Sequence, residues 1–219
     1  MRRRLLPAVD NRDHLRRNGL WMLYVALALR NWTVMELFGL MPVYLPETLG
    51  ISEFTMGVLL AINPARQTVF MLLFGRVADA WGCKPLVVVG IAGSGLFALV
   101  AAAATLFSGP LRLVIAALSF VVIAAAFSAM TTGALAFIGD VAPERRESEL
   151  MGLRSTAKGV GGVFGPVVVA GLAGVFGYPT AFAVGSSMAF VAAGLAGWKL
   201  VESREGVVLP GRGAVPGDD

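Results

Sequence analysis

The chain has 219 residues, of which 57% are hydrophobic and only 15% are charged, and its mean hydropathy is +0.75. Soluble domains carry about 25% charged residues, so this composition excludes an ordinary soluble domain and indicates an integral membrane protein. The net charge of +4 comes from basic residues that lie between apolar runs. This placement favours a role in membrane topology over nucleic-acid binding.

The chain opens with a basic polar segment, residues 1–20, which lacks the features of a signal peptide and is expected to stay in the cytoplasm. Six apolar runs follow, each close to the ~20 residues that a helix needs to cross a bilayer. We place them at residues 21–45, 55–74, 86–107, 113–138, 152–176 and 180–200. Because the runs are continuous rather than alternating, they predict helices and not strands. The predicted fold is an all-α membrane protein with a six-helix domain over 21–201 and a disordered tail over 202–219.

The basic residues fall on alternate sides of these predicted spans. One set of polar segments contains fifteen of them: Arg2, Arg3, Arg4, Arg12, Arg16, Arg17, Arg76, Lys84, Arg145, Arg146, Arg154, Lys158, Lys199, Arg204 and Arg212. The opposite set contains only Arg112. Since cytoplasmic loops are enriched in Lys and Arg, both termini are predicted to be cytoplasmic, which requires an even number of spans in the cell membrane.

Three charged residues lie inside the predicted spans, where charge is costly and often functional. Arg30 and Glu36 fall in the first span and Arg66 in the second. Asn63 and Gln67 share a helical face with Arg66, by their i, i+3, i+4 spacing. We take these five residues as candidates for solute binding and proton coupling. Glu36 could load and release a proton near the midplane, or it could form a static ion pair with Arg66 or Arg30 that orients the helices.

The link between the second and third spans reads Gly75-Arg76-Val77-Ala78-Asp79-Ala80-Trp81-Gly82-Cys83-Lys84. We expect its glycines to permit a tight turn between the two helices. The segment resembles the cytoplasmic signature of the major facilitator superfamily, Gly-x-Leu-x-Asp-Arg-x-Gly-Arg-Lys. Gly75, Asp79, Gly82 and Lys84 match, whereas Val77, Ala80 and Cys83 depart from it. The resemblance implies a conformational latch, and the alternative is an ordinary basic loop.

The fifth run contains Gly161, Gly165 and Pro166. Small residues at Gly-x-x-x-Gly spacing let helix backbones approach closely in lipid. The stretch resembles the Gly-x-x-x-Gly-Pro-x-x-Gly-Gly motif of proton-coupled drug antiporters in the same superfamily, although Val169 and Ala170 stand in place of its last two glycines. A helix-packing face and a coupling role are both open.

Together, these features resemble one six-helix half of a major facilitator transporter, with spans one and two closer to the family's C-terminal half. The resemblance implies a secondary transporter that moves a small solute, coupled to protons, together with a second half or a second copy of itself. The alternative is a non-transporting scaffold or a truncated remnant that binds partner helices. No enzyme, cofactor or nucleic-acid partner is indicated, because the single Cys83 and His14 exclude a Cys/His metal cluster and no nucleophile–base pair or phosphate loop is present. The sequence does not identify the solute.

Overall fold

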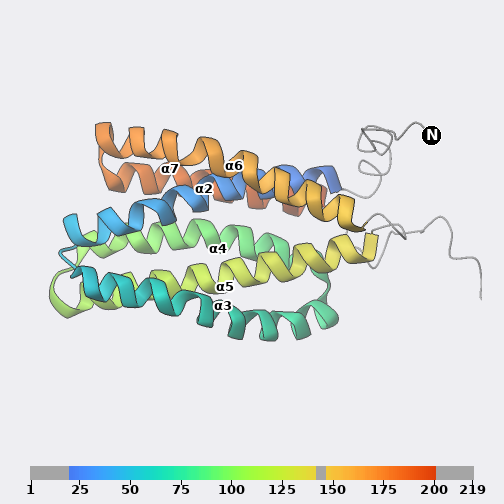
Figure 1. Ribbon diagram of the computed structural model, residues 1–219, viewed down its shortest axis with the longest axis horizontal. Helices are drawn as coiled ribbons and strands as arrows, with labels where there is room; N and C mark the ends of the chain where they lie inside the picture. The colour runs from blue at the N-terminus through green and yellow to red at the C-terminus, as the bar shows by residue number, and fades with distance from the viewer. Residues whose placement is uncertain (1–19, 142–146, 201–219) are drawn as a thin grey trace, which may run out of the picture.

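The computed structural model describes residues 20–141 and 147–200, without the side chains of residues 33–37, 141 and 147. This part consists of six long helices and one short 3-10 turn (Figure 1). They are α2 (Leu20–Glu47), α3 (Glu53–Trp81), α4 (Cys83–Ala103), η1 (Ala104–Leu106), α5 (Gly109–Val141), α6 (Glu147–Phe176) and α7 (Tyr178–Lys199). The predicted all-α fold is confirmed. The N-terminal segment and the tail lie outside the described residues.

Five of these helices, α3 to α7, are long and apolar enough to cross a membrane. They make the chain a multi-pass membrane protein, because an α-helix satisfies its own backbone hydrogen bonds and can therefore cross lipid. The sixth long helix, α2, has 28 residues and is not among the five. Its role as a further span therefore belongs with the proposals below.

Successive helices run in alternating directions, so the start of α2, the α3–α4 turn and the end of α7 lie at one end of the bundle (Figure 1). Two of the turns consist of a single glycine. Gly82 joins α3 to α4 with a φ of 91°, and Gly177 joins α6 to α7 with a φ of 82°. Side chains are strained at such positive φ, so glycine allows the chain to reverse within one residue.

The helices pack as two intertwined groups of three, α2–α4 and α5–α7. In one layer α2 packs against α6 and α7, and in the other α5 packs against α3 and α4, while α4 and α7 join the layers (Figure 1). The two groups make equivalent contacts. If α2, α3 and α4 are replaced by α5, α6 and α7, and the reverse, the pairs of helices named above are again in contact. The first helix of each group thus lies in the layer of the other group, which is the arrangement expected for two three-helix repeats.

Two apolar clusters fill the two ends of the bundle. Buried polar side chains lie between the two clusters. Near the start of α2, Leu23 and Leu27 pack with Phe137. Near its end, Tyr44 packs with Phe97 and other aromatic side chains. Between the clusters α2 carries two buried polar side chains, Arg30 and Asn31. Arg30 and Asn31 therefore lie at the middle of the bundle rather than at either end.

Arg112, the single basic residue of the predicted external set, joins two links at the end of the bundle opposite the start of α2. Its Nε donates to the Phe107 carbonyl at 2.8 Å, and its Nη1 donates to the Leu49 carbonyl at 3.0 Å. The side chain thus connects the α2–α3 link to the turn before α5. We expect Arg112→Ala to lower the free energy of unfolding by about 1 kcal/mol, since it removes two charge-assisted hydrogen bonds at a partly hydrated site. Thermal unfolding in detergent, with exposed Arg76→Ala as the control, measures this; equal effects of the two substitutions would contradict it.

Candidate functional site

The most deeply buried charge in the described part of the chain is Arg30, on α2, with 1% of its surface exposed. Its Nε donates to the Ser94 hydroxyl on α4 at 3.1 Å. Ser94 in turn donates to the Gly90 carbonyl at 3.0 Å, so it is satisfied within its own helix. Arg30 Nη1 and Nη2 have no hydrogen-bond partner among the described residues. Two donor nitrogens of a buried cation are therefore left unmatched.

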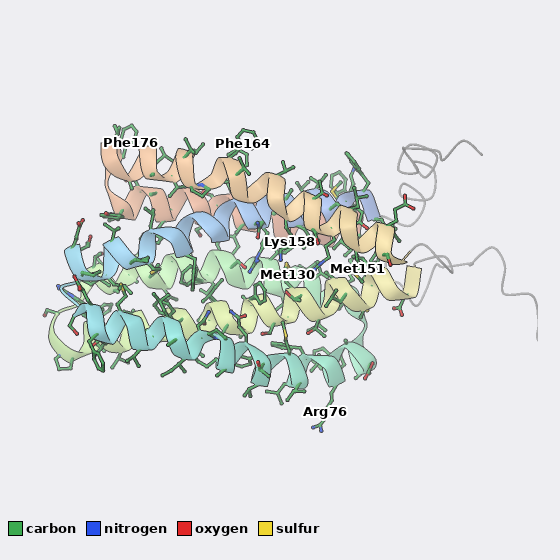
Figure 2. All side chains as sticks on the ribbon, in the orientation of Figure 1. Arg76, Met130, Met151, Lys158, Phe164 and Phe176 are labelled. Atoms are coloured by element: carbon green, nitrogen blue, oxygen red, sulfur yellow. The ribbon has the colours of Figure 1, made fainter. Side chains whose placement is uncertain are left out.

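Arg30 shares the ring of Phe127, on α5, with a second cation. The Arg30 Cζ lies 5.3 Å from the ring centroid, and the Nζ of Lys158, on α6, lies 5.7 Å from it. Figure 2 shows Lys158 between the two layers of helices. A cation over an aromatic face gains some electrostatic stabilisation, but far less than a carboxylate would provide. Arg30 of α2 and Lys158 of α6 thus face one aromatic ring. Among the described residues, no ion pair is seen that would neutralise either charge.

Arg154 adds a third positive charge, one helical turn before Lys158 on the same face of α6. Its Nε is buried and has no partner in the part that the structure describes. Arg30 and Lys158 face the same Phe127 ring and Arg154 lies one turn from Lys158, so the three positive charges repel one another. We call these three residues the basic cluster. It lies where α2, α5 and α6 meet.

Hydrogen bonds and close packing hold α6 against α2 beside this cluster. Asn31 Nδ2 donates to the Lys158 carbonyl, and the Tyr24 hydroxyl donates to the Leu150 carbonyl at 3.1 Å. Gly161 lies directly against the α2 backbone, where a Cβ at this position would collide with the Ala28 carbonyl oxygen. The position of the α6 cations relative to Arg30 is therefore fixed by backbone contacts.

The remaining residues of the fifth-run motif lie on different faces of α6. Gly165 is buried one turn after Gly161, whereas Pro166 is exposed. The helix continues past Pro166 to Phe176. Since proline lacks an N–H, the carbonyl four residues earlier loses its usual helical donor without ending the helix.

The three polar residues expected on one face of α3 have different surroundings. Asn63 is buried, and its Oδ1 has no partner in the described chain. Arg66 Nη2 donates to the Leu59 carbonyl at 2.9 Å, while its Nε is likewise unmatched among described groups. The Gln67 carbonyl accepts from the Ser128 hydroxyl of α5 at 2.9 Å, which fixes α3 to α5. These residues lie on α3, which packs mainly on α5, so they are separate from the basic cluster.

Glu36 lies in α2, but its side chain is outside the described ones. Its suggested pairing with Arg66 or Arg30 therefore stays a prediction.

The tight turn expected between the second and third spans is present, and it lies at Gly82 rather than at Gly75. Helix α3 continues through Gly75 and Asp79 to Trp81, and only Gly82 forms the turn. The helix extends beyond the apolar run because Arg76, Asp79 and Ala80 are compatible with an exposed last helical turn. Asp79 is exposed, and Lys84 is half-buried in the first turn of α4. Arg76 points away from the bundle (Figure 2).

Cys83 stands where the family signature has a basic residue. Its thiol donates to Asp140 Oδ2 on α5 at 3.7 Å. The neutral thiol of Cys83, a weak donor, thus contacts Asp140 near the end of α5, whereas the family signature would place a cation there.

Sequence reasoning missed Arg154, Lys158 and Phe127 as site residues. It assigned both cations to a cytoplasmic segment, but α6 begins at Glu147 and carries them two to three turns into the helix. Their i, i+4 spacing within or next to an apolar run is a signal that could have identified them. Phe127 could not have been identified, because one aromatic residue among many carries no pattern.

Comparisons with known proteins identify the family. The family model of the Major Facilitator Superfamily matches residues 20–214. Over 146 residues, the chain is 31% identical to the tetracycline resistance protein, class H, of Pasteurella multocida. The matched part is 62% of this chain and 34% of that protein, so the chain spans only about a third of its relative. The chain belongs to the Major Facilitator Superfamily.

Proposed function

We propose that this chain forms one six-helix half of a secondary transporter that moves a small solute across the cell membrane by alternating access. In this proposal α2 is the sixth span and both termini are cytoplasmic. The observation that carries it is the group of buried polar side chains at mid-bundle, where two nitrogens of Arg30 have no partner among the described residues. Buried charge at membrane depth is expensive and typically marks a solute or ion pathway.

A second half is required to close such a pathway. The matched region covers only 34% of the relative's length. In addition, α3 and α6 carry rows of large exposed apolar side chains, which include Val69 and Leu72 on α3 and Val163 and Val167 on α6. Helices α3 and α6 occupy equivalent positions in the two three-helix groups. Their exposed apolar faces can therefore contact lipid or a second half. The partner proposed here is a second six-helix half in the same orientation, supplied by a second copy of this chain or by another six-helix segment.

The competing proposal is a scaffold or a truncated remnant that only binds partner helices. Oligomeric state in mild detergent, combined with uptake by proteoliposomes, separates the two. A strict monomer that moves no solute would support the remnant. A dimer or hetero-dimer that moves solute would support the transporter. The relative's name makes tetracycline the first solute to include in the panel.

Glu36 is the proposed proton-coupling residue. We expect Glu36→Gln to abolish solute movement driven by a pH gradient and to flatten its pH dependence, because an amide cannot release a proton. Flux in proteoliposomes with an imposed pH gradient measures this. Glu53→Gln, at the exposed start of α3, is the matched control and should transport normally. Normal gradient-driven flux in the Glu36 variant would exclude the proton role while leaving solute binding open.

A further inference from the structure

We propose that the basic cluster binds one anionic group, a carboxylate or a phosphate, between α2, α5 and α6. The proposal concerns binding, so it stands whether or not Glu36 couples protons. It begins from Arg30, whose guanidinium is almost fully enclosed yet satisfied at only one of its three nitrogens within the described chain.

An isolated buried cation is unfavourable unless an opposite charge or several acceptors match it. The described surroundings of Arg30 supply one hydroxyl and one aromatic ring. Lys158, which faces the same ring as Arg30, and Arg154, one turn from Lys158, have the same sign as Arg30. An anion placed among the three would remove their mutual repulsion and accept from the unmatched nitrogens at once. The cluster therefore has the charge of an anion site.

The donor set also indicates which anions fit. A guanidinium is a planar fork that bonds the two oxygens of a carboxylate or phosphate side by side. In Arg30 the two terminal nitrogens that form such a fork are the unmatched ones. Lys158 would add a point charge from α6. Chloride has a single atom and cannot use the fork in this way, so it should bind more weakly.

Access to the cluster is expected from the α6 side. Arg154 and Lys158 are half-buried, whereas Arg30 is enclosed behind them. An incoming anion would therefore meet the α6 cations first and reach Arg30 last. The same chemistry could come from an acidic group on a solute or from the headgroup of an anionic lipid, and the experiment below separates these sources.

The test uses the full chain in a neutral detergent and follows its thermal unfolding. Sodium benzoate or sodium phosphate is compared with sodium chloride at equal ionic strength, and the chain is also placed in nanodiscs of phosphatidylcholine with or without phosphatidylglycerol. We expect benzoate or phosphate to raise the unfolding temperature above the chloride value. The apparent affinity should fall about tenfold or more in Arg30→Gln and in Lys158→Gln, as loss of one charge-assisted pair implies. The exposed Arg76→Gln should behave as the wild type.

The outcomes are distinct. A response to soluble anions assigns the site to an acidic solute group, whereas a response only to phosphatidylglycerol assigns it to a lipid headgroup. If neither differs from its control in the wild type, or if the response survives in both Arg30→Gln and Lys158→Gln, the proposal is wrong. Should Arg30→Gln fail to fold, Arg30→Lys keeps the charge without the fork and is expected to bind benzoate more weakly, together with Arg154→Gln and Lys158→Gln.

Discussion

Gly161→Ala is expected to be among the most destabilising single-methyl additions in the chain. The new Cβ would collide with the Ala28 carbonyl oxygen and would lie 2.9 Å from the Trp32 amide nitrogen. Both are backbone atoms of α2, so no side-chain rotation can relieve the contact, and α6 must move away. Overpacking of this kind costs about 3 kcal/mol. The movement would also shift Lys158 and Arg154 relative to Arg30.

The matched control is Gly159→Ala on the same helix, where a Cβ meets nothing within 4 Å. Alanine has a higher helix propensity than glycine by up to about 1 kcal/mol, so this variant should be neutral or slightly stabilised. Thermal unfolding of both variants in the same detergent measures the difference. If Gly161→Ala were as stable as Gly159→Ala, the close α2–α6 contact would be wrong.

The helices could be predicted well because their signals are local. Continuous apolar runs and the Gly- or Pro-containing breaks between them predicted all six long helices. Gly82 and Gly177 lie at turns, where glycine is favoured because it adopts positive φ. The ends were less accurate. Helix α3 extends seven residues past the predicted Phe74, since Arg76, Ala78 and Ala80 are good helix formers and continue the helix beyond the lipid-compatible run.

Close approaches between helices could be predicted only in part. The Gly-x-x-x-Gly pattern indicated Gly161, but a similarly tight contact joins Gly90 of α4 to α5, where an added Cβ would lie 2.7 Å from the Ala126 carbonyl oxygen. Gly90 has no glycine four residues away, at the Gly-x-x-x-Gly spacing, although Ser94 at that position completes a wider small-x-x-x-small spacing. A search restricted to glycine pairs therefore missed it.

The candidate site required tertiary information. Arg30 could be selected from its position inside an apolar run, but its neighbours could not. The pairing suggested between α2 and the adjacent helix α3 was that of Glu36 with Arg66, whereas α2 packs mainly against α6 and α7 in the other layer. This crossing of the two repeats brings Lys158 and Phe127 to Arg30 from segments about a hundred residues or more away along the chain. Only the packing of the whole bundle determines that arrangement.

Arg30→Met is expected to raise thermal stability in buffer without carboxylate or phosphate. Methionine is a flexible apolar side chain that can fill most of the enclosed volume, and the change removes two unmatched buried nitrogens. Ser94 stays satisfied through the Gly90 carbonyl. Replacing buried charge with apolar groups of similar volume can stabilise a protein by about 1–4 kcal/mol. The gain should therefore appear as an increase of several degrees in the unfolding temperature.

The same variant should lose the stabilisation by benzoate or phosphate, because the guanidinium fork is gone. Lys158→Met is the matched comparison. Its side chain is only half-buried, so its stability should change by less than about 1 kcal/mol. Unfolding curves of the wild type and both variants, each with and without the anion, give the complete comparison. If Arg30→Met instead lowers stability by about 1–4 kcal/mol, Arg30 is a structural link between α2 and α4. A gain together with a lost anion response would mean that the buried charge costs stability in the empty site and serves binding.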